Sequence, residues 1–440
     1  MHDQFASLVR EKILSALDAP LPSLTRREAR VPAIPGKAMA VIGMRGAGKT
    51  SFLHQVRADR IAAGRAAEHQ VYFNFEDERL AGLEASQLGV IPETHLRLFP
   101  EPHAKPTGLF LDEIQIVPGW EGFVRRLLDE GGHEVFLSGS SAKLLSREIA
   151  TSMRGRGWEI EIHPFSFREW LRHHGHEEPE GQGGLNARRA VRVDAWFAQW
   201  LETGGFPEAQ GLDLPTRRKL LQGYVDVLLL RDVIERHRVA NVTALRWMVR
   251  RLLGNPGGPF SVTKFEADLK SQGVAAGRET LYEMLGHLED AFLLRAVPVA
   301  TDSEKRRQVN PRKIYPVDTA LGPVFDRSGK PNTDHTLEVA VHGELWRRGA
   351  EVGYVRTTEG FEVDFLAREA DGSQTLIQVC ANPEAPETLA REVRALQTAA
   401  DEVPSARTLI LTAASHLTLP DAPAPIQIMP AWRWMLDSAG

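Results

Sequence analysis

The sequence predicts an α/β fold whose N-terminal part is a parallel sheet covered by helices. Short apolar runs recur along this part, at residues 38–43, 71–75, 108–113 and 134–140. Helical stretches such as residues 123–130 separate them, and the first run leads through a glycine-rich turn into a helix from about Lys49. Strands alternating with helices are typical of a parallel sheet with both faces covered, and such sheets bind ligands at the carboxyl ends of their strands.

The rest of the chain predicts helices first and a second α/β segment later. An amphipathic helix near residues 5–17 precedes a proline-rich approach to the first strand. After residue 165 the pattern is helical at 168–172, 190–203 and 217–238. Three short helices and a β-hairpin are expected from residue 242 onward. The final segment predicts helices at 337–348 and 386–399 and strands at 352–356, 362–366, 375–379 and 408–412.

Composition excludes several classes of protein. The formal net charge of −5 gives no overall attraction to nucleic acid or to anionic membranes, so any such contact needs a local patch. The single cysteine, Cys380, rules out an intramolecular disulfide and gives a zinc finger no support. No window approaches the roughly 18 uninterrupted apolar residues of a membrane helix. We therefore expect a soluble, cytoplasmic protein with no membrane partner.

The glycine-rich turn fits the pattern G-x-x-x-x-G-K-[ST] without a mismatch. Its backbone N–H groups and the following helix N-terminus suit phosphate oxygens. Lys49 is expected to reach the β- and γ-phosphates, and the Thr50 hydroxyl to ligate Mg²⁺. The alternative is a structural strand-to-helix turn. The nucleotide-binding residues predicted here are Gly43, Met44, Arg45, Gly46, Ala47, Gly48, Lys49, Thr50 and Ser51.

Two acidic residues, Asp112 and Glu113, follow the third apolar run directly. A carboxylate at the end of a buried strand needs a cation or hydrogen bonds. Asp112 is therefore predicted to bind Mg²⁺, directly or through water, and Glu113 to orient and deprotonate an attacking water. The alternative is a helix N-cap followed by a first-turn glutamate. The pair favours triphosphate hydrolysis over binding alone, so ATP and Mg²⁺ are the expected cofactors.

Further polar residues follow the fourth run. Ser138 or Ser140 is a candidate sensor of the γ-phosphate, with turn and N-cap serines as the competing interpretation. Arg154 and Arg156 are candidates for an arginine that a neighbouring subunit supplies to the transition state, and Arg156 is the one we select. Ordinary surface arginines are the alternative.

With these residues in hand, the chain resembles a family of prokaryotic AAA+-like ATPases. The family joins a P-loop domain to a C-terminal domain of unknown function that is related to restriction endonucleases. The resemblance rests on ordered matches over nearly the whole chain: GMRGAGKT, VYFNFED, LFLDEIQ, LSGSSAKLLSREIATSMRGR, HPFSFREWL, GGFPE, LLLRDVIER, KIYPVD and EVDFL. It implies a P-loop ATPase domain at 37–165 after an approach segment at 1–36, a helical lid at 166–240, a winged helix at 241–328 and a nuclease-like domain at 329–440. Ring or helical assembly is a further expectation of the family.

The nuclease-like segment lacks part of a restriction-type metal site. Such a site needs an acid at one strand end and Asp/Glu-x-Lys on the next strand. Asp364 supplies the first acid, but Gln378 and Cys380 stand where the second acid and the lysine belong. Glu338 and Glu344 on the preceding helix could donate a carboxylate, but the set of metal ligands stays incomplete. We therefore predict a nuclease-like fold without nuclease activity.

DNA contact is expected through the winged helix. Its recognition helix, near residues 279–294, is acidic, whereas the hairpin that follows carries Lys305, Arg306, Arg307, Arg312 and Lys313. A basic wing gripping phosphates and a solvated loop are the two interpretations. The main hypothesis is an ATPase whose hydrolysis drives rearrangement or assembly in a DNA-linked process such as repair, mobile-element control or defence. The alternatives are a nucleotide-dependent switch that acts on a protein partner with little turnover and a metal-dependent nuclease that uses Asp364.

Overall fold

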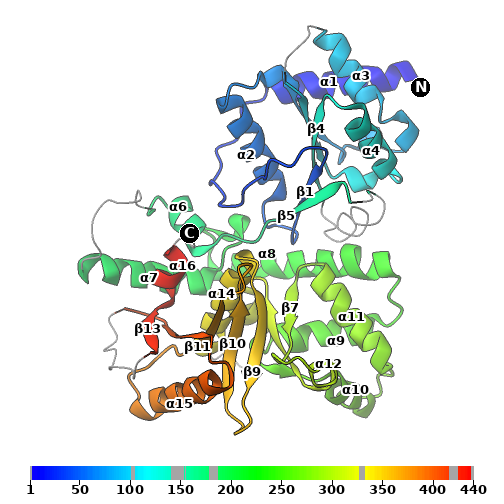
Figure 1. The fold of residues 1–440 in the computed structure, drawn as a ribbon. Coiled ribbons are helices and arrows are strands. Elements are labelled where there is room, and N and C mark those ends of the chain that lie inside the picture. Colours follow the sequence, from blue (N-terminus) through cyan, green and yellow to red (C-terminus); the bar gives the residue numbers. More distant parts are fainter. Residues whose placement is uncertain are drawn as a thin grey trace. The chain divides into compact units, whose positions relative to one another are not determined.

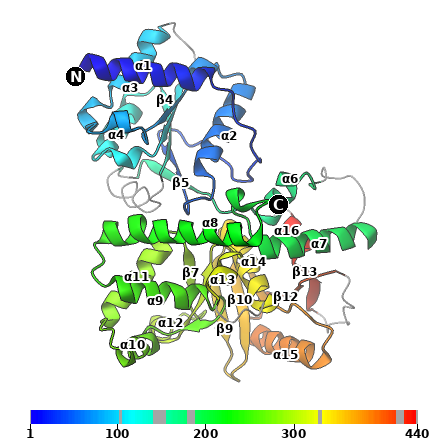
Figure 2. The ribbon, with the colours of Figure 1, turned by 180° about the vertical axis from the view of Figure 1, so that it is seen from behind.

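The chain forms two compact units, Met1–His163 and Pro164–Gly440 (Figures 1 and 2). The computed structural model describes residues 2–100, 105–139, 153, 155–177, 187–326, 332–415 and 425–437. Within these ranges, none of the helices combines the length and the apolarity that crossing a bilayer requires. The five-segment division of the sequence is finer than these two units and stays a prediction.

The first unit is built on a five-stranded sheet in the order β2-β3-β4-β1-β5, and every neighbouring pair is parallel. The predicted parallel α/β fold is confirmed. The strands are β1 (Ala38–Ile42), β2 (Gln70–Asn74), β3 (Thr107–Asp112), β4 (His133–Ser138) and β5 (Gly157–Glu161). Sequence reasoning missed β5, because GWEIE alternates polar and apolar residues and has two exposed positions, as an edge strand permits.

Helix α2 (Lys49–Ala62) covers one face of this sheet. Its Phe52 and Val56 pack in one core with Val41, Phe110 and Phe136, and the rings of Phe110 and Phe136 stack with centroids 4.6 Å apart. Burying such side chains stabilises the unit by roughly 1.5–3 kcal/mol each. The other long helices of the unit are α1 (His2–Asp18), α3 (Val90–Leu98) and α4 (Trp120–Glu130).

The second unit begins with helices and a small sheet. The helices are α6 (Phe167–His173), α7 (Ala187–Thr203), α8 (Leu214–Val227), the π-helical turn η6 (Leu228–Glu235), α9 (Val242–Leu253), α10 (Val262–Ser271), α11 (Arg278–Asp290) and α13 (Leu321–Phe325). The antiparallel sheet has the order β6-β8-β7, from β6 (Pro259–Phe260), β7 (Leu294–Val297) and β8 (Arg312–Pro316).

The expected hairpin loop at 303–313 is wrong in one respect. Residues Glu304–Val309 form a short helix, α12, between β7 and β8. Ser303 begins it, because its hydroxyl accepts a hydrogen bond from the backbone N–H of Arg306. The basic residues therefore divide between a helix and a buried strand.

The unit ends in a mixed five-stranded sheet, in the order β13-β12-β11-β10-β9. Pairs β9–β10 and β10–β11 are antiparallel, and pairs β11–β12 and β12–β13 are parallel. The strands are β9 (Glu351–Arg356), β10 (Glu362–Arg368), β11 (Gln374–Val379), β12 (Arg407–Thr412) and β13 (Gln427–Pro430), and the helices are α14 (Thr333–Arg347), α15 (Pro386–Glu402) and α16 (Ala431–Leu436).

Alternate residues of these strands enter two different cores. Phe365 and Ile377 pack with α14, whereas Leu366 and Leu376 pack with α15. The period of two places the helices on opposite faces of the sheet. The core that holds α14 also contains side chains of α6, α7 and β8, including Tyr315. The segments predicted as lid, winged helix and nuclease-like domain thus share one hydrophobic core.

Candidate functional site

The loop at residues 43–50 joins β1 to α2 in a conformation that requires glycine. Gly43, Gly46 and Gly48 have φ angles of +140°, +80° and +96°, a region that L side chains rarely adopt. A Cβ on Gly43 would also lie 2.1 Å from the carbonyl oxygen of Ile162. The loop therefore turns tightly and leads directly into the N-terminus of α2 at Lys49.

Lys49 lies over this loop. Its side chain is buried, and its Nζ donates hydrogen bonds to the carbonyl oxygens of Gly43 at 3.0 Å and Met44 at 3.1 Å. The ammonium is thus held beside the backbone N–H groups and the α2 N-terminus that suit an anion. Of the other predicted loop residues, Ala47 is buried and Ser51 is exposed.

Asp112 ends β3 and is completely buried. Its Oδ2 accepts hydrogen bonds from the Thr50 hydroxyl at 2.9 Å and from the Tyr72 hydroxyl at 2.7 Å. Its Oδ1 accepts one from the Ser138 hydroxyl. Since Asp112 is paired with Ser138 across β3 and β4, the predicted residues Thr50, Asp112 and Ser138 come together at the carboxyl edge of the sheet.

Tyr72 is a site residue that sequence reasoning missed. It lies on β2, two residues before Asn74, which pairs with Asp112 across β2 and β3. Since side chains of a strand alternate, Tyr72 and Asn74 share a face, and the period-two pattern of QVYFN was the available signal. Burial, together with the charge of Asp112, raises the pKa of Tyr72, so this phenol stays protonated and donates.

Glu113 has a φ angle of +58°, which is rare for a residue other than glycine. Its backbone N–H donates to the carbonyl oxygen of Ser138 at 2.9 Å, and its carboxylate accepts from the Gln115 side chain. A left-handed residue of this kind costs about 1–3 kcal/mol. This conformation turns the chain sharply immediately after the buried Asp112.

Two more side chains belong to this neighbourhood. Burial and the charge of Glu113 raise the pKa of Glu76, while Arg45 opposes the shift. Burial lowers the pKa of His54, and the His54 ring lies 4.4 Å from the Tyr72 ring. Glu76 lies in the segment VYFNFED, and the sequence alone assigns it no role.

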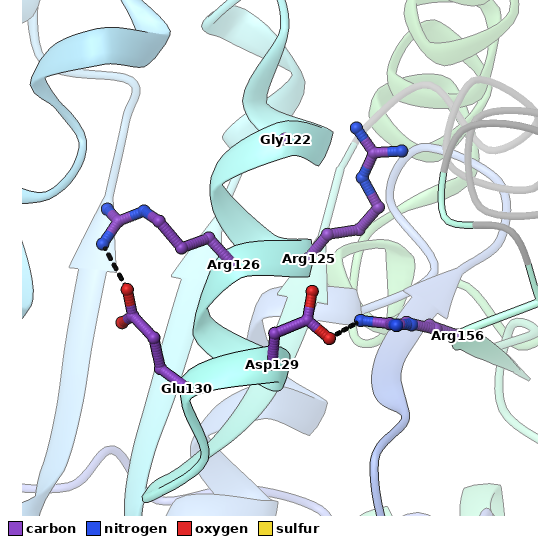
Figure 3. Close-up of a pocket in the computed structure, with 6 residues that line it drawn as sticks. All are labelled: Gly122, Arg125, Arg126, Asp129, Glu130 and Arg156. Carbon is purple, nitrogen blue, oxygen red and sulfur yellow. Dashed lines mark hydrogen bonds and ion pairs between the residues drawn. The ribbon is translucent and has the colours of Figure 1, made fainter.

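Arg156 lines a hollow of about 630 Å³ on α4, and none of the loop residues 43–50 lines this hollow. Figure 3 shows it beside Asp129, with which it forms an ion pair, while Arg126 pairs with Glu130 at 3.0 Å. Gly122 and Arg125 complete the lining. Ser140 and Arg154, two other candidates from the sequence, lie outside the described residues.

The second unit holds a buried lysine cluster, formed by Lys313, Glu338, Glu362 and Asp364. The Lys313 Nζ lies 2.9 Å from Asp364 and 2.9 Å from Glu362, and 3.9 Å from Glu338. Burial lowers the pKa of Lys313, but the three carboxylates outweigh it and the net shift is upward. Burial and the charge of Asp364 raise the pKa of Glu338 to about 8.

Lys313 was therefore misplaced by the sequence prediction. It is 5% exposed on β8, so it cannot grip a phosphate on a solvent-facing wing. It brings to Asp364 the positive charge that Cys380 cannot supply on β11. This lysine lies 51 residues before Asp364 in the chain. A motif search along one strand therefore cannot find it.

The remaining residues of the degenerate nuclease site surround Asp364. Gln378 accepts the backbone N–H of Asp364 at 3.3 Å, and the N–H of Val379 donates to the Asp364 carboxylate at 3.0 Å. Cys380 is buried, and burial raises its pKa to about 11. The Tyr315 hydroxyl donates to Glu338 at 3.1 Å. Every described carboxylate close to Asp364 therefore already has a partner.

Four other basic residues predicted for nucleic acid remain near the surface. Lys305, Arg306 and Arg307 are exposed on α12, and Arg312 is half-buried at the start of β8. Arg307 lies 3.8 Å from Glu351. Three adjacent exposed cations are a local basic patch on an otherwise acidic chain.

The described residues contain no group of three or more His, Cys, Asp or Glu side chains arranged to hold a metal ion. Thr50 and Asp112 alone could not form a complete coordination shell. They fit Mg²⁺ only in the manner typical of triphosphate sites, where phosphate oxygens and water supply the other ligands. The lysine cluster does not fit a divalent cation, because the Lys313 ammonium already lies among its carboxylates.

Comparison with known proteins defines the class. A family profile described as "AAA domain" matches residues 35–171, which include the loop, Lys49 and Asp112. A second profile, "Domain of unknown function (DUF8612)", matches residues 194–329. Residues 35–171 therefore belong to the AAA class of P-loop ATPase domains.

Two relatives are similar over most of the chain, one of them over nearly its full length. The chain belongs to the family of "Uncharacterized protein MJ1544" of Methanocaldococcus jannaschii, to which it is 31% identical over 442 residues, or 98% of this chain and 95% of the relative. An uncharacterized protein of Haemophilus influenzae is also 31% identical, over 75% of this chain and 79% of its own length.

Similar solved structures are more distant. The Walker-type ATPase PABY2304 of Pyrococcus abyssi matches with a TM-score of 0.40 and 12% identity, over 72% of this chain and 94% of that one. The Aeropyrum pernix ORC1 protein in complex with DNA gives a TM-score of 0.26 and 14% identity, over 73% and 91% of the two chains.

Proposed function

We propose that this chain hydrolyses MgATP at the loop formed by residues 43–50. The observation that carries the proposal is the buried contact of Asp112 with Thr50 and Ser138, immediately before Glu113. Three strands and the first turn of α2 converge on this carboxylate, so a structural cap is a poor explanation for it. The AAA domain match covers all of these residues.

Each side chain then has a role in the reaction. Lys49 exchanges its two loop carbonyls for the β- and γ-phosphates, which stabilises the charge that develops on transfer. Thr50 and Asp112 would hold Mg²⁺, which neutralises the phosphate oxygens when bound. Glu113 orients the attacking water and accepts its proton, and Ser138 keeps Asp112 in place. The predicted sensor role of Ser138 thereby becomes indirect.

Two variants test this proposal. Lys49→Ala should lose ATP binding and turnover together, because the phosphates lose their cation. Glu113→Gln should keep ATP binding while turnover falls by roughly 10²–10⁴-fold, the usual contribution of a general base. Phosphate release and nucleotide binding are measured side by side, and undiminished turnover in both variants would contradict the proposal.

We also propose that Arg156 acts across a subunit boundary in a homo-oligomer. Its side chain pairs with Asp129 on its own chain rather than with the loop, and it is 43% exposed. A neighbour's nucleotide could therefore displace Asp129 and recruit the guanidinium. We expect Arg156→Ala and Lys49→Ala each to be inactive alone. Recovery of ATP turnover when the two variants are mixed would support this arrangement, and a mixture that stays inactive would oppose it.

We also propose that the helices and small sheet of the second unit bind DNA. The order α9-β6-α10-α11-β7-α12-β8 and the strand order β6-β8-β7 support a winged helix. Residues 166–240 are the proposed lid. Contact would use Lys305, Arg306 and Arg307 on α12. Changing all three to glutamine should weaken DNA binding and flatten its salt dependence, by about one unit of slope per lost phosphate contact.

The C-terminal sheet is proposed to keep a nuclease-like fold without cleavage. The lysine cluster supports this, because Lys313 occupies the space between the carboxylates. Metal-dependent nicking that disappears in Asp364→Ala would contradict the proposal. The same observation favours the second candidate function, a nucleotide-dependent switch whose C-terminal unit docks a protein partner. Tight ATP binding with negligible turnover, with every DNA tested, would favour that switch over the ATPase.

A further inference from the structure

A cavity of about 400 Å³ lies under α1 in the first unit. Its size falls within the roughly 300–1,000 Å³ of small-molecule sites. The lining comes from α1, from the segment that follows it, from α2, from β2 and from Arg79, which follows β2. The lining residues used below are Lys12, Ala19, His54, Arg57, Tyr72 and Arg79.

The cavity is lined by more cations than anions. Lys12 pairs with Asp77 at 2.7 Å, and Arg79 pairs with Asp77 and with Glu11, each at 2.9 Å. These charges balance one another. The exception is Arg57, which carries a full charge into the lining of the same cavity.

Arg57 is 5% exposed. Its guanidinium donates to the backbone carbonyls of Gln70 at 2.9 Å and Ala16 at 3.0 Å. Within the described part of the chain no carboxylate lies within ion-pair distance of it. A buried guanidinium without a counter-charge is costly, and burial lowers the pKa of Arg57 accordingly. An anion in the cavity would remove this cost.

The same cavity reaches a side chain that contacts Asp112. His54 and Tyr72 form one wall, and the Nδ1 atom of His54 is buried without a hydrogen-bond partner among the described residues. The Tyr72 hydroxyl donates to Asp112, on the oxygen that also accepts from Thr50. A ligand that contacts Tyr72 is therefore one hydrogen bond away from Asp112.

We propose that the cavity under α1 binds a small phosphate-bearing ligand and that Tyr72 couples its occupancy to Asp112. The ligand phosphate supplies the missing counter-charge of Arg57, and the apolar segment at residues 20–22 accepts an organic group. The Tyr72 hydroxyl has one proton, so the bound anion competes with Asp112 for it. Loss of that support weakens the hold of Asp112 on Mg²⁺, and the ligand is an inhibitor. The coupling rests on the proposed ATPase function, whereas the binding does not.

Binding is tested with AMP and with inorganic phosphate as probes, by calorimetry on the full-length Lys49→Ala chain. Because this substitution disables the ATP site, the heat of binding that is measured comes from the cavity. Ala19→Phe, added to it, places a ring at the mouth of the cavity on an exposed position. The matched control is Ala63→Phe, also exposed, at the end of α2 and outside the cavity. We expect binding of at least one probe that Ala19→Phe abolishes and Ala63→Phe leaves unchanged. No binding of either probe at millimolar concentration, or equal binding in both phenylalanine variants, overturns the site.

Coupling is tested by ATPase titrations with Mg²⁺ in the otherwise wild-type chain. The probe that binds should raise the half-saturating Mg²⁺ concentration, and Tyr72→Phe should raise it roughly 10–100-fold without any probe, as loss of an outer hydrogen bond to a metal ligand does. In Tyr72→Phe the probe should add nothing further. A probe effect that persists in Tyr72→Phe overturns the coupling. A wild-type chain with no turnover at all rejects the ATPase proposal instead, and leaves the calorimetric test of the cavity intact.

Discussion

Replacing Lys313 by methionine removes the only cation of the buried lysine cluster while keeping most of the side-chain volume. The Lys313 ammonium lies 2.9 Å from Asp364, which is 7% exposed. Glu362 lies equally close, but its side chain is 50% exposed, so solvent screens it and it adds little. The loss is therefore dominated by one uncompensated buried carboxylate, for which about 3–5 kcal/mol of unfolding free energy is typical.

The assay is urea unfolding of the full chain, followed by tryptophan fluorescence, since most of the tryptophans lie in the second unit. Lys313→Met should lower the midpoint of that unit's transition and leave the first unit's transition in place. Adding Asp364→Asn removes the orphaned charge and should recover most of the lost stability. A loss below about 1 kcal/mol, the level of a surface ion pair, would refute the description of this cluster as a buried charge network.

Other outcomes follow from the same structure. Gly43→Ala should destabilise the first unit by roughly 3 kcal/mol or more, because a left-handed conformation and a backbone clash combine; unchanged thermal unfolding would contradict this. Thr50→Val should lower ATP turnover at least about tenfold, or 1.4 kcal/mol, and excess Mg²⁺ should recover little of it. The pKa of Glu338 is raised from 4.5 to about 8 in the folded state, so folding takes up a proton between these values. Stability of the second unit should therefore fall as the pH rises from about 5 to 8, by at most ~1.4 kcal/mol per pH unit. Glu338→Gln should flatten that slope, and an identical slope in both chains would contradict the assignment.

The first unit could be predicted well because its signals are local. A glycine-rich turn between an apolar strand and a helix, and an acidic pair after a second apolar strand, each lie within a few residues. The parallel pairing that joins Asp112 to Ser138 then follows from the α/β pattern. Tyr72 was missed because its partner is defined by the strand order, which the sequence does not state.

The second unit was less predictable because its site is assembled from distant segments. Lys313 stands in a basic stretch that looks solvent-facing, yet β8 carries it into the same core as Phe365 and α14. A helix capped by Ser303 replaced the expected hairpin loop, since a local side-chain hydrogen bond decided its conformation. Neither outcome leaves a periodic pattern in the sequence. The sequence itself shows that β11 carries Cys380 and no lysine, but a motif confined to one strand cannot show that Lys313 of β8 lies beside Asp364.

The most direct test of the central claim is phosphate release by the wild-type chain and by Glu113→Gln under saturating MgATP, with ATP affinity measured on the same samples. We predict equal affinity within about threefold and turnover at least roughly 100-fold slower in Glu113→Gln. Turnover that survives the substitution would contradict hydrolysis by Glu113 at this loop.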